Sequence, residues 1–573
     1  MPTESDLITL TALAEGPNTS GPNGALLTRV RVPVERITLD AHSAATMLSA
    51  RFAISVNGTA PQHRRRPALA DLADPRPPWG CVDRAPSPHR VDLLADRRFL
   101  AQHVYAVAAS TLFVFESTLG RRMGWAGGKR LSIFAYDQVA ASDSGYDRDE
   151  RSIRLGHYAD DQGPGRVPLA LFRDVVAHEV THAIIDGYRP RWADAHAGID
   201  ALALHEAIAD LVAILSVFAA DERVEQLLAG VVPPVADQAA LVGITTELLR
   251  GRLFGFGDGL ASHTAAHSSA RSAASRYGLA GRNSLTDEIP DDWRTLPSPH
   301  ARSQAVVHAL LAVVVRLWVE RIDRPGGRAS LVQVASAGAI VGRRVLTMLV
   351  RGLGYLPPVD TTWEDLLHGI LAADEQLVPG DDNHYRDAVV EAFAAIGVRR
   401  ATPVDVAALA PQLRYPIRLA ALGSDPEEVL RLIWENPALI EAAGLDPARS
   451  ITVDRVRPSV RVSPDGFVVS EIGASFTQEF LLDRAEARRA GLPAAGPVLI
   501  RRGGLLRFDE GGRLSFAAFA PTVPTARNAS TASTARTASI APPVRRRATR
   551  EVADAADAPQ TTGTAFHQAM ERR

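Results

Sequence analysis

The chain contains almost no cysteine and almost no lysine. Cys81 is the only cysteine among 573 residues, so no intrachain disulfide can form and no disulfide framework supports a secreted protein. Lys129 is the only lysine, and arginine supplies the rest of the basic side chains. We interpret this bias as a matter of codon usage, and we draw no function from it.

The sequence also lacks a membrane-directing leader and a long apolar run. A secretory signal peptide has a basic region followed by a sustained apolar core, and the first 13 residues have neither. The longest apolar run, residues 305–315, is too short for a bilayer, which takes about 20 residues. We therefore expect a soluble cytoplasmic protein with no membrane partner.

No strong charge of either sign marks the chain as a whole. The formal net charge is −2, and the hydrophobic and charged fractions of 46% and 22% are ordinary for a globular protein. Such a small net charge creates no global field that would attract a polyanion, so we expect no nucleic-acid partner. The length allows for several domains.

An apolar segment, residues 175–185, carries the pattern H-E-x-x-H. Residues four apart lie on one face of an α-helix, so His178 and His182 can present their imidazoles to a single ion. Glu179 is the candidate general base, because zinc lowers the pKa of its bound water towards roughly 7 and a carboxylate must take the proton. The pattern predicts one Zn²⁺ per chain; the alternative is a helix that carries these letters by chance.

A second apolar helix, residues 202–213, supplies the remaining candidates. Two histidines leave the coordination shell of zinc incomplete, and Glu206 follows His182 at a distance that lets the chain turn and pack back. Asp210 shares the helix face of Glu206 and can accept a hydrogen bond from the outer N–H of a ligating histidine. We expect Glu206 as the third metal ligand and Asp210 as the residue that orients a histidine.

Taken together, His178-Glu179-x-x-His182 followed by Glu206-x-x-x-Asp210 resembles the gluzincin metallopeptidases. The letters H-E-A-I-A-D around Glu206 are similar to the N-E-A-x-x-D of thermolysin-like enzymes. The resemblance covers about residues 95–400. It implies a β-containing lobe, a helical lobe and a metal in the cleft between them. It also implies an edge strand before the first motif, around residues 144–149, that pairs with an extended substrate.

The resemblance further implies a histidine that stabilises the oxyanion from the start of a helix in the second lobe. His300 stands in such a setting, although Gln304 replaces the usual glycine and the usual aspartate is missing, so that its orienting role would pass to residue 291 or 292. His263 and His267 are weaker candidates in an irregular loop. Tyr188, the only tyrosine between His182 and Glu206, is interpreted as a residue of the helix end.

Periodicity and composition divide the chain into four parts and predict an α+β fold. We expect a β-rich segment at 1–94, the zincin-like domain at 95–400, a small α+β domain at 401–520, and a disordered tail at 521–573 that is rich in Thr, Ala, Ser, Arg and Pro. In the second domain, helical periodicity is expected near 303–322, 328–350, 361–377 and 382–396, and Pro168 is expected in the first turn of the helix that carries H-E-x-x-H. In the third part, we expect a helix near 426–440 and strands near 450–462, 466–480 and 498–516.

These expectations lead to a zinc-dependent endopeptidase that acts on a peptide or protein substrate. Metal-activated water would attack the peptide bond, with Glu179 as the general base. The alternative is a catalytically silent scaffold that keeps zinc as a structural staple and acts as a protein-binding module. Retention of Glu179 argues for the enzyme, because a structural metal site needs no base.

Overall fold

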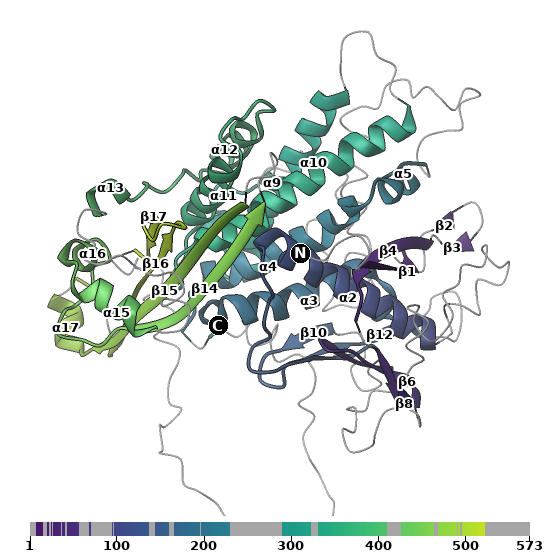
Figure 1. Ribbon diagram of the computed structural model, residues 1–573, viewed down its shortest axis with the longest axis horizontal. Coiled ribbons are helices and arrows are strands. Elements are labelled where there is room, and N and C mark those ends of the chain that lie inside the picture. The colour runs from purple at the N-terminus through teal and green to yellow at the C-terminus, as the bar shows by residue number, and fades with distance from the viewer. Residues whose placement is uncertain are drawn as a thin grey trace, which may run out of the picture.

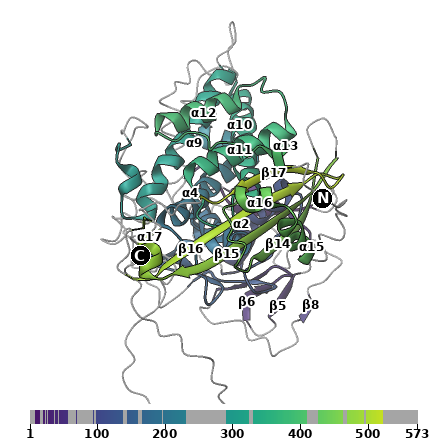
Figure 2. The ribbon, with the colours of Figure 1, turned by 90° about the vertical axis from the view of Figure 1, so that its left-hand side faces the viewer.

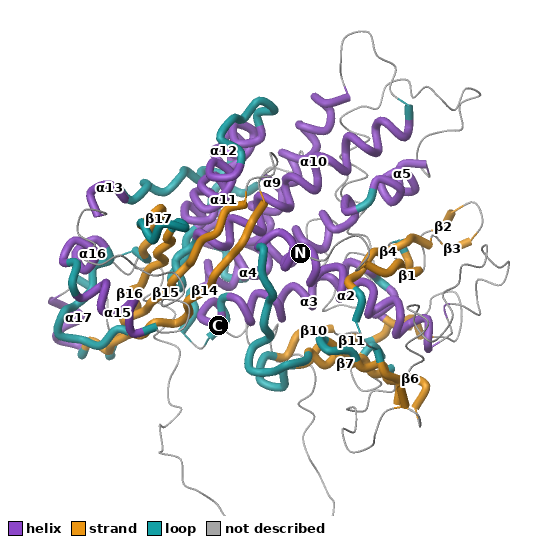
Figure 3. Tube along the Cα trace, in the orientation of Figure 1, coloured by secondary structure: helices purple, strands orange, loops and turns teal. Residues whose placement is uncertain are grey.

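The computed structural model shows an α+β protein in which helices pack against separate sheets (Figure 1; Figure 3). The structure describes residues 7–56, 68–69, 94, 97–136, 144–159, 166–229, 289–322, 330–409 and 426–521, with short gaps inside several of these ranges. Cys81, His263, His267 and residues 522–573 of the expected disordered tail lie outside the described residues.

A mixed sheet of seven strands lies beside the helix that carries the H-E-x-x-H motif (Figure 1). Its strands, in spatial order, are β10 (Ser144–Asp147), β11 (Ser152–Leu155), β9 (Leu131–Phe134), β7 (Phe52–Ser55), β6 (Ser43–Leu48), β5 (Thr38–Asp40) and β8 (Ala68–Leu69). β9 runs parallel to β7 and to β11, and the other neighbours are antiparallel. Strands from before residue 70 therefore complete the sheet that continues after residue 130, and β10 forms its edge.

Smaller strand pairs flank this sheet. They are β1 (Leu7–Leu13) with β4 (Leu27–Pro33), β2 (Ser20–Gly21) with β3 (Gly24–Ala25), and β12 (His157–Ala159) with β13 (Arg166–Pro168). In β4, buried Thr28, Val30 and Val32 alternate with exposed Arg29 and Arg31. This alternation is typical of a strand with one covered face, and α2 (Arg97–Leu119) packs against β1 and β4.

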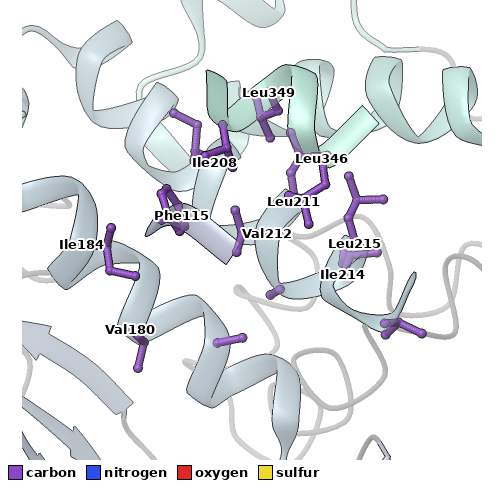
Figure 4. Close-up of a cluster of buried hydrophobic side chains, with 14 of the residues drawn as sticks. Phe115, Val180, Ile184, Ile208, Leu211, Val212, Ile214, Leu215, Leu346 and Leu349 are labelled. Carbon is purple, nitrogen blue, oxygen red and sulfur yellow. The ribbon is translucent and has the colours of Figure 1, made fainter. Parts of the chain in front are cut away.

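The two motif helices are held by apolar packing on nearly all sides. They are α3 (Arg173–Tyr188), which is buried along its whole length, and α4 (Ile199–Leu215), which is buried from Ala201 onwards. A helix that is apolar all round belongs inside a core. Figure 4 shows Phe115 of α2, Ile184 of α3 and Leu211 of α4 in one cluster of buried side chains. Burying each such side chain contributes about 1.5–3 kcal/mol, so the core fixes how α3 and α4 face each other.

The helical lobe contains α9, the longest helix among the described residues. Its helices are α5 (Asp221–Ala229), α9 (Pro299–Ile322), α10 (Leu331–Gly352), α11 (Trp363–Leu377), α12 (Tyr385–Ala395) and α13 (Val406–Leu409). Ser330 and Thr362 each form a capping box, with Gln333 and Asp365 respectively, which satisfies backbone donors at the starts of α10 and α11. Five short 3₁₀ turns connect described elements: η2 (Leu169–Leu171), η3 (Pro190–Trp192), η4 (Ser216–Ala219), η5 (Trp293–Thr295) and η6 (Leu353–Tyr355).

A four-stranded antiparallel sheet dominates the C-terminal part (Figure 2). Its strands are β14 (Thr452–Val462), β15 (Val468–Leu482), β16 (Val498–Phe508) and β17 (Leu514–Phe519), accompanied by α15 (Glu427–Trp434), α16 (Pro437–Ala442) and α17 (Arg484–Arg489). This part has a hydrophobic cluster of its own, distinct from the large cluster of residues before 400. It docks on the rest through the ion pairs Arg191–Asp454 and Arg501–Asp194.

Most predicted elements are present, with differences where a proline or glycine interrupts the chain. Pro168 ends β13 and precedes η2, so the prediction that it opens the motif helix is wrong; α3 begins at Arg173. The helix predicted for 426–440 is two helices, because Pro437 cannot donate to the turn before it and instead starts α16. The strand predicted for 498–516 is the hairpin of β16 and β17.

Two described segments are long and apolar enough to cross a membrane by length and composition, Phe99–Leu119 and Ile199–Ala219. In the fold they are 78% and 100% buried against other parts of the protein. Both belong to the core helices α2 and α4, whose apolar character their packing explains.

The end of the motif helix depends on a close backbone contact that only glycine permits. A Cβ atom at Gly187 would lie 2.1 Å from the carbonyl oxygen of Gly124. We expect Gly187→Ala to lower the free energy of unfolding by about 1–3 kcal/mol, because the two segments must separate. Chemical denaturation measures the change. Gly124→Ala is the matched control, since its Cβ would meet no atom within 4 Å; equal effects of the two substitutions would contradict this explanation.

Candidate metal centre

The packing of α3 against α4 brings three predicted ligands together. The Nε2 atoms of His178 and His182 lie 2.9 Å apart, and Glu206 Oε2 lies 3.6 Å from each of them. These are the three residues of a buried group whose ligand atoms all lie within 4.8 Å of one another and could hold a metal ion. An ion about 2.1 Å from each of three tetrahedral ligands would place the ligand atoms about 3.4 Å apart, so the spacing fits.

Hydrogen bonds to the outer ring nitrogens turn both histidines towards this point. Asp210 Oδ1 lies 2.9 Å from His178 Nδ1, so this nitrogen carries the proton and Nε2 keeps its lone pair for a metal. His182 Nδ1 lies 2.6 Å from His205 Nδ1, where one ring donates and the other accepts. If His182 donates, its Nε2 is likewise available as a ligand.

Burial and neighbouring charges set the protonation of the ligands. Burial lowers the pKa of His182 to about 4, so its ring is neutral at pH 7. Burial would raise the pKa of Glu206, but His300 and His182 hold it well below the usual range. Burial would lower the pKa of His178, but Asp210 and two further carboxylates raise it overall. Metal binding at Nε2 would therefore compete with protonation of the His178 ring.

Glu179 lies at the edge of the seven-stranded sheet and outside the ligand group. Its Oε2 accepts a 2.8 Å hydrogen bond from the backbone N–H of Tyr146 in β10. The Tyr146 hydroxyl in turn donates to Asp186 Oδ2 at 2.9 Å, and Arg148 pairs with Asp186 Oδ1 at 3.0 Å. These contacts fasten the edge strand to α3. They also place the carboxylate of Glu179 against β10, the end strand of the sheet among the described residues.

His300 joins the same group from the first turn of α9. Its Nε2 lies 3.1 Å from Glu206 Oε2, and its side chain is buried. Arg302 holds this turn against the start of α4 through Asp200 at 2.7 Å. The carboxylate beside His300 Nε2 is therefore Glu206, whereas the residues expected to orient it, 291 and 292, are exposed. The role of His300 as an oxyanion donor stays a prediction.

The structure adds residues that the sequence analysis did not assign. His205 orients His182, and the Tyr146 N–H positions Glu179. His205 stands where the pattern N-E-A-x-x-D has asparagine. Both side chains can form hydrogen bonds, so this position was a signal in the sequence that could have identified His205. The contact of Tyr146 is made by its backbone, so its side-chain identity gave no signal. Tyr188 ends α3, as expected.

Asp210 should govern metal affinity without being a ligand. We expect Asp210→Asn to weaken zinc binding by about 10–100-fold, because the carboxylate that orients His178 and increases its basicity is lost. A competition titration against a chromogenic chelator measures the affinity. Asp221→Asn, which removes an exposed carboxylate that pairs with Arg343, is the control and should bind zinc like the wild type. Equal affinity of all three proteins would exclude this role.

The comparisons with known proteins do not assign the chain to a family. The sequence matches no family model, and no curated protein matches it. We therefore infer the function from the geometry of this centre.

Proposed function

We propose that the protein is a zinc-dependent endopeptidase of the gluzincin type, with a zincin-like core. The observation that carries this proposal is the group of three possible ligands, His178, His182 and Glu206. Glu179 lies beside this group and is held by a hydrogen bond from strand β10. Two imidazoles and one carboxylate, with a coordination position left for water, are typical of catalytic zinc. A second carboxylate outside that set is what a hydrolytic site requires as a base.

A bound zinc ion would supply a Lewis acid that lowers the pKa of water to about 7 and polarises a carbonyl oxygen. Glu179 accepts the proton of the attacking water at a carboxylate oxygen and passes it to the leaving amine. The backbone N–H of Tyr146 fixes the position of this carboxylate. His300, at the start of α9, would donate a hydrogen bond to the oxyanion.

The substrate that fits this arrangement is an extended peptide. β10 is the end strand of its sheet among the described residues, and Glu179 is hydrogen-bonded to it. An extended chain can add to such an edge by backbone hydrogen bonds, which would carry a scissile bond past the base. Peptide recognition of this kind depends on the backbone, so it gives little information about side-chain preference.

A second candidate function is a catalytically silent scaffold that keeps zinc as a structural staple. One observation favours it: His178, Glu179, His182 and Glu206 are each at most 4% exposed, which is typical of closed structural sites. The endopeptidase requires that the helical lobe and the β10 edge separate enough to admit a peptide. The two candidates differ in whether the intact protein cleaves peptides.

The division between ligands and base gives the first test of this proposal. We expect Glu179→Gln to retain about one zinc per chain and to lose peptide hydrolysis, because the amide cannot accept the proton. His182→Ala should lose both the metal and the activity. Elemental analysis and a digest of a peptide library measure the two properties. Hydrolysis by a zinc-free protein would contradict the mechanism, and zinc-loaded wild type without hydrolysis would favour the scaffold.

Substitution of His300 separates an oxyanion donor from a metal ligand. We expect His300→Ala to retain zinc and the fold but to lose about 10²–10³ in kcat, the usual cost of one oxyanion donor. Turnover and zinc content are measured on the same preparation. His308→Ala, on the same helix, is the control and should turn over like the wild type. Loss of zinc from His300→Ala would instead make His300 a metal ligand, in keeping with its contact to Glu206.

A further inference from the structure

A second concentration of charge lies where the C-terminal sheet meets the end of α3. A pocket between these parts is lined by residues of α10, η6, β14, β15 and β16 and by the segments that follow α2 and α3. Its lining contains six arginines and no carboxylate. The arginines are Arg121, Arg189, Arg351, Arg455, Arg457 and Arg507.

Backbone carbonyl groups occupy part of the hydrogen-bonding capacity of these arginines. Arg455 and Arg457 both donate to the carbonyl oxygen of Gly187 near the end of α3. Arg507 donates to the carbonyl oxygen of Gly354 at 2.9 Å. These bonds join the two parts of the protein, but a carbonyl group carries no net charge. The C-terminus of a helix contributes only about half a negative charge, so the positive charge of the pocket is not balanced by it.

Nearby carboxylates do not balance the charge either. Glu471 pairs with Arg507. The two acids that act on Arg455 are Asp186 and Asp454, and these pair with Arg148 and Arg191, which lie outside the pocket lining. The pocket therefore keeps an excess of positive charge. Uncompensated charge of this kind is costly away from water.

Several guanidinium nitrogens in this region are buried without a hydrogen-bond partner. Arg189 and Arg507 are each 6% exposed, and their Nε atoms have no partner among the described residues. The Nε atom of Arg121 is also buried without a hydrogen-bond partner among the described residues. Buried donors normally find a partner, so three such atoms around one cavity indicate an acceptor that the protein itself does not provide.

Tyr188, which lines the pocket, lies in the same positive potential. The guanidinium carbons of Arg121, Arg189 and Arg457 lie 4.6, 5.0 and 5.0 Å from the centre of its ring. Burial would raise the pKa of the Tyr188 hydroxyl, yet Arg121, Arg189 and Arg507 lower it overall. A phenol buried to this extent has a lowered pKa only where cations outweigh desolvation.

We propose that this pocket binds a phosphate-type oxyanion, either free phosphate or the phosphoryl group of a small molecule. Guanidinium groups bind phosphate oxygens through paired N–H donors, and no lining carboxylate would repel the anion. The cavity of about 50 Å³ has room for about three to five waters, and a phosphate ion has five heavy atoms. The anion would join the end of α3 to the C-terminal sheet. This site does not depend on the metal centre or on peptide hydrolysis.

Calorimetric titration of the full-length protein tests the proposal with two probes, inorganic phosphate and phenyl phosphate, at constant ionic strength. We expect saturable 1:1 binding with a sub-millimolar Kd for at least one probe. Tighter binding of inorganic phosphate would identify the free anion, and tighter binding of phenyl phosphate a phosphomonoester. Saturation must be shown, because phosphate also stabilises proteins non-specifically by exclusion from their surface.

Two variants and a neighbouring control assign the binding to the pocket. Arg121→Gln and Arg457→Gln, each checked for folding by circular dichroism, should weaken binding at least tenfold. Arg122→Gln removes an exposed arginine next in sequence that does not line the pocket, and it should bind like the wild type. The proposal is overturned if neither probe saturates the wild type, or if Arg122→Gln weakens binding as much as the pocket variants do.

Discussion

The candidate metal centre depends on the apolar contact between α3 and α4. This contact buries Glu206 completely and brings its carboxylate within 3.6 Å of two imidazoles, in surroundings where an uncompensated charge would be very costly. Burial raises the pKa of Glu206, but the nearby imidazoles of His300 and His182 lower it overall. A bound metal ion would further compensate the negative charge of this carboxylate. The apolar core therefore brings these side chains together, and because it excludes water, the charge of Glu206 must be balanced by neighbouring positive groups.

The helix α3 contacts three parts of the protein along its length. Its middle carries His178 and His182, and Glu179 is fastened to the edge strand β10. Asp186, one turn beyond His182, binds Tyr146 and Arg148. Its end is packed against the arginine pocket and the C-terminal sheet. A change in the docking of that sheet would thus act on the end of the helix that positions the ligands.

The sequence predicted the parts of the centre that depend on helical spacing. His178 and His182 are four residues apart on one face, and Glu206 and Asp210 are four apart on another, so each pair converges once the helices pack. Contacts that depend on tertiary structure were missed. His205 meets His182 because of how α4 is rotated, and Tyr146 contributes a backbone N–H that no side-chain pattern reveals. The arginines of the pocket come from segments more than 380 residues apart in the sequence, from Arg121 to Arg507, so no local pattern could group them.

The most direct test is crystallography of the zinc-loaded protein with data collected on both sides of the zinc absorption edge. The proposed centre predicts one anomalous peak within bonding distance, about 2.0–2.2 Å, of His178 Nε2, His182 Nε2 and a Glu206 carboxylate oxygen. Glu179 should lie outside the coordination shell. A peak at any other set of residues, or no peak in protein that was purified with zinc and never exposed to chelator, would contradict the assignment of this centre.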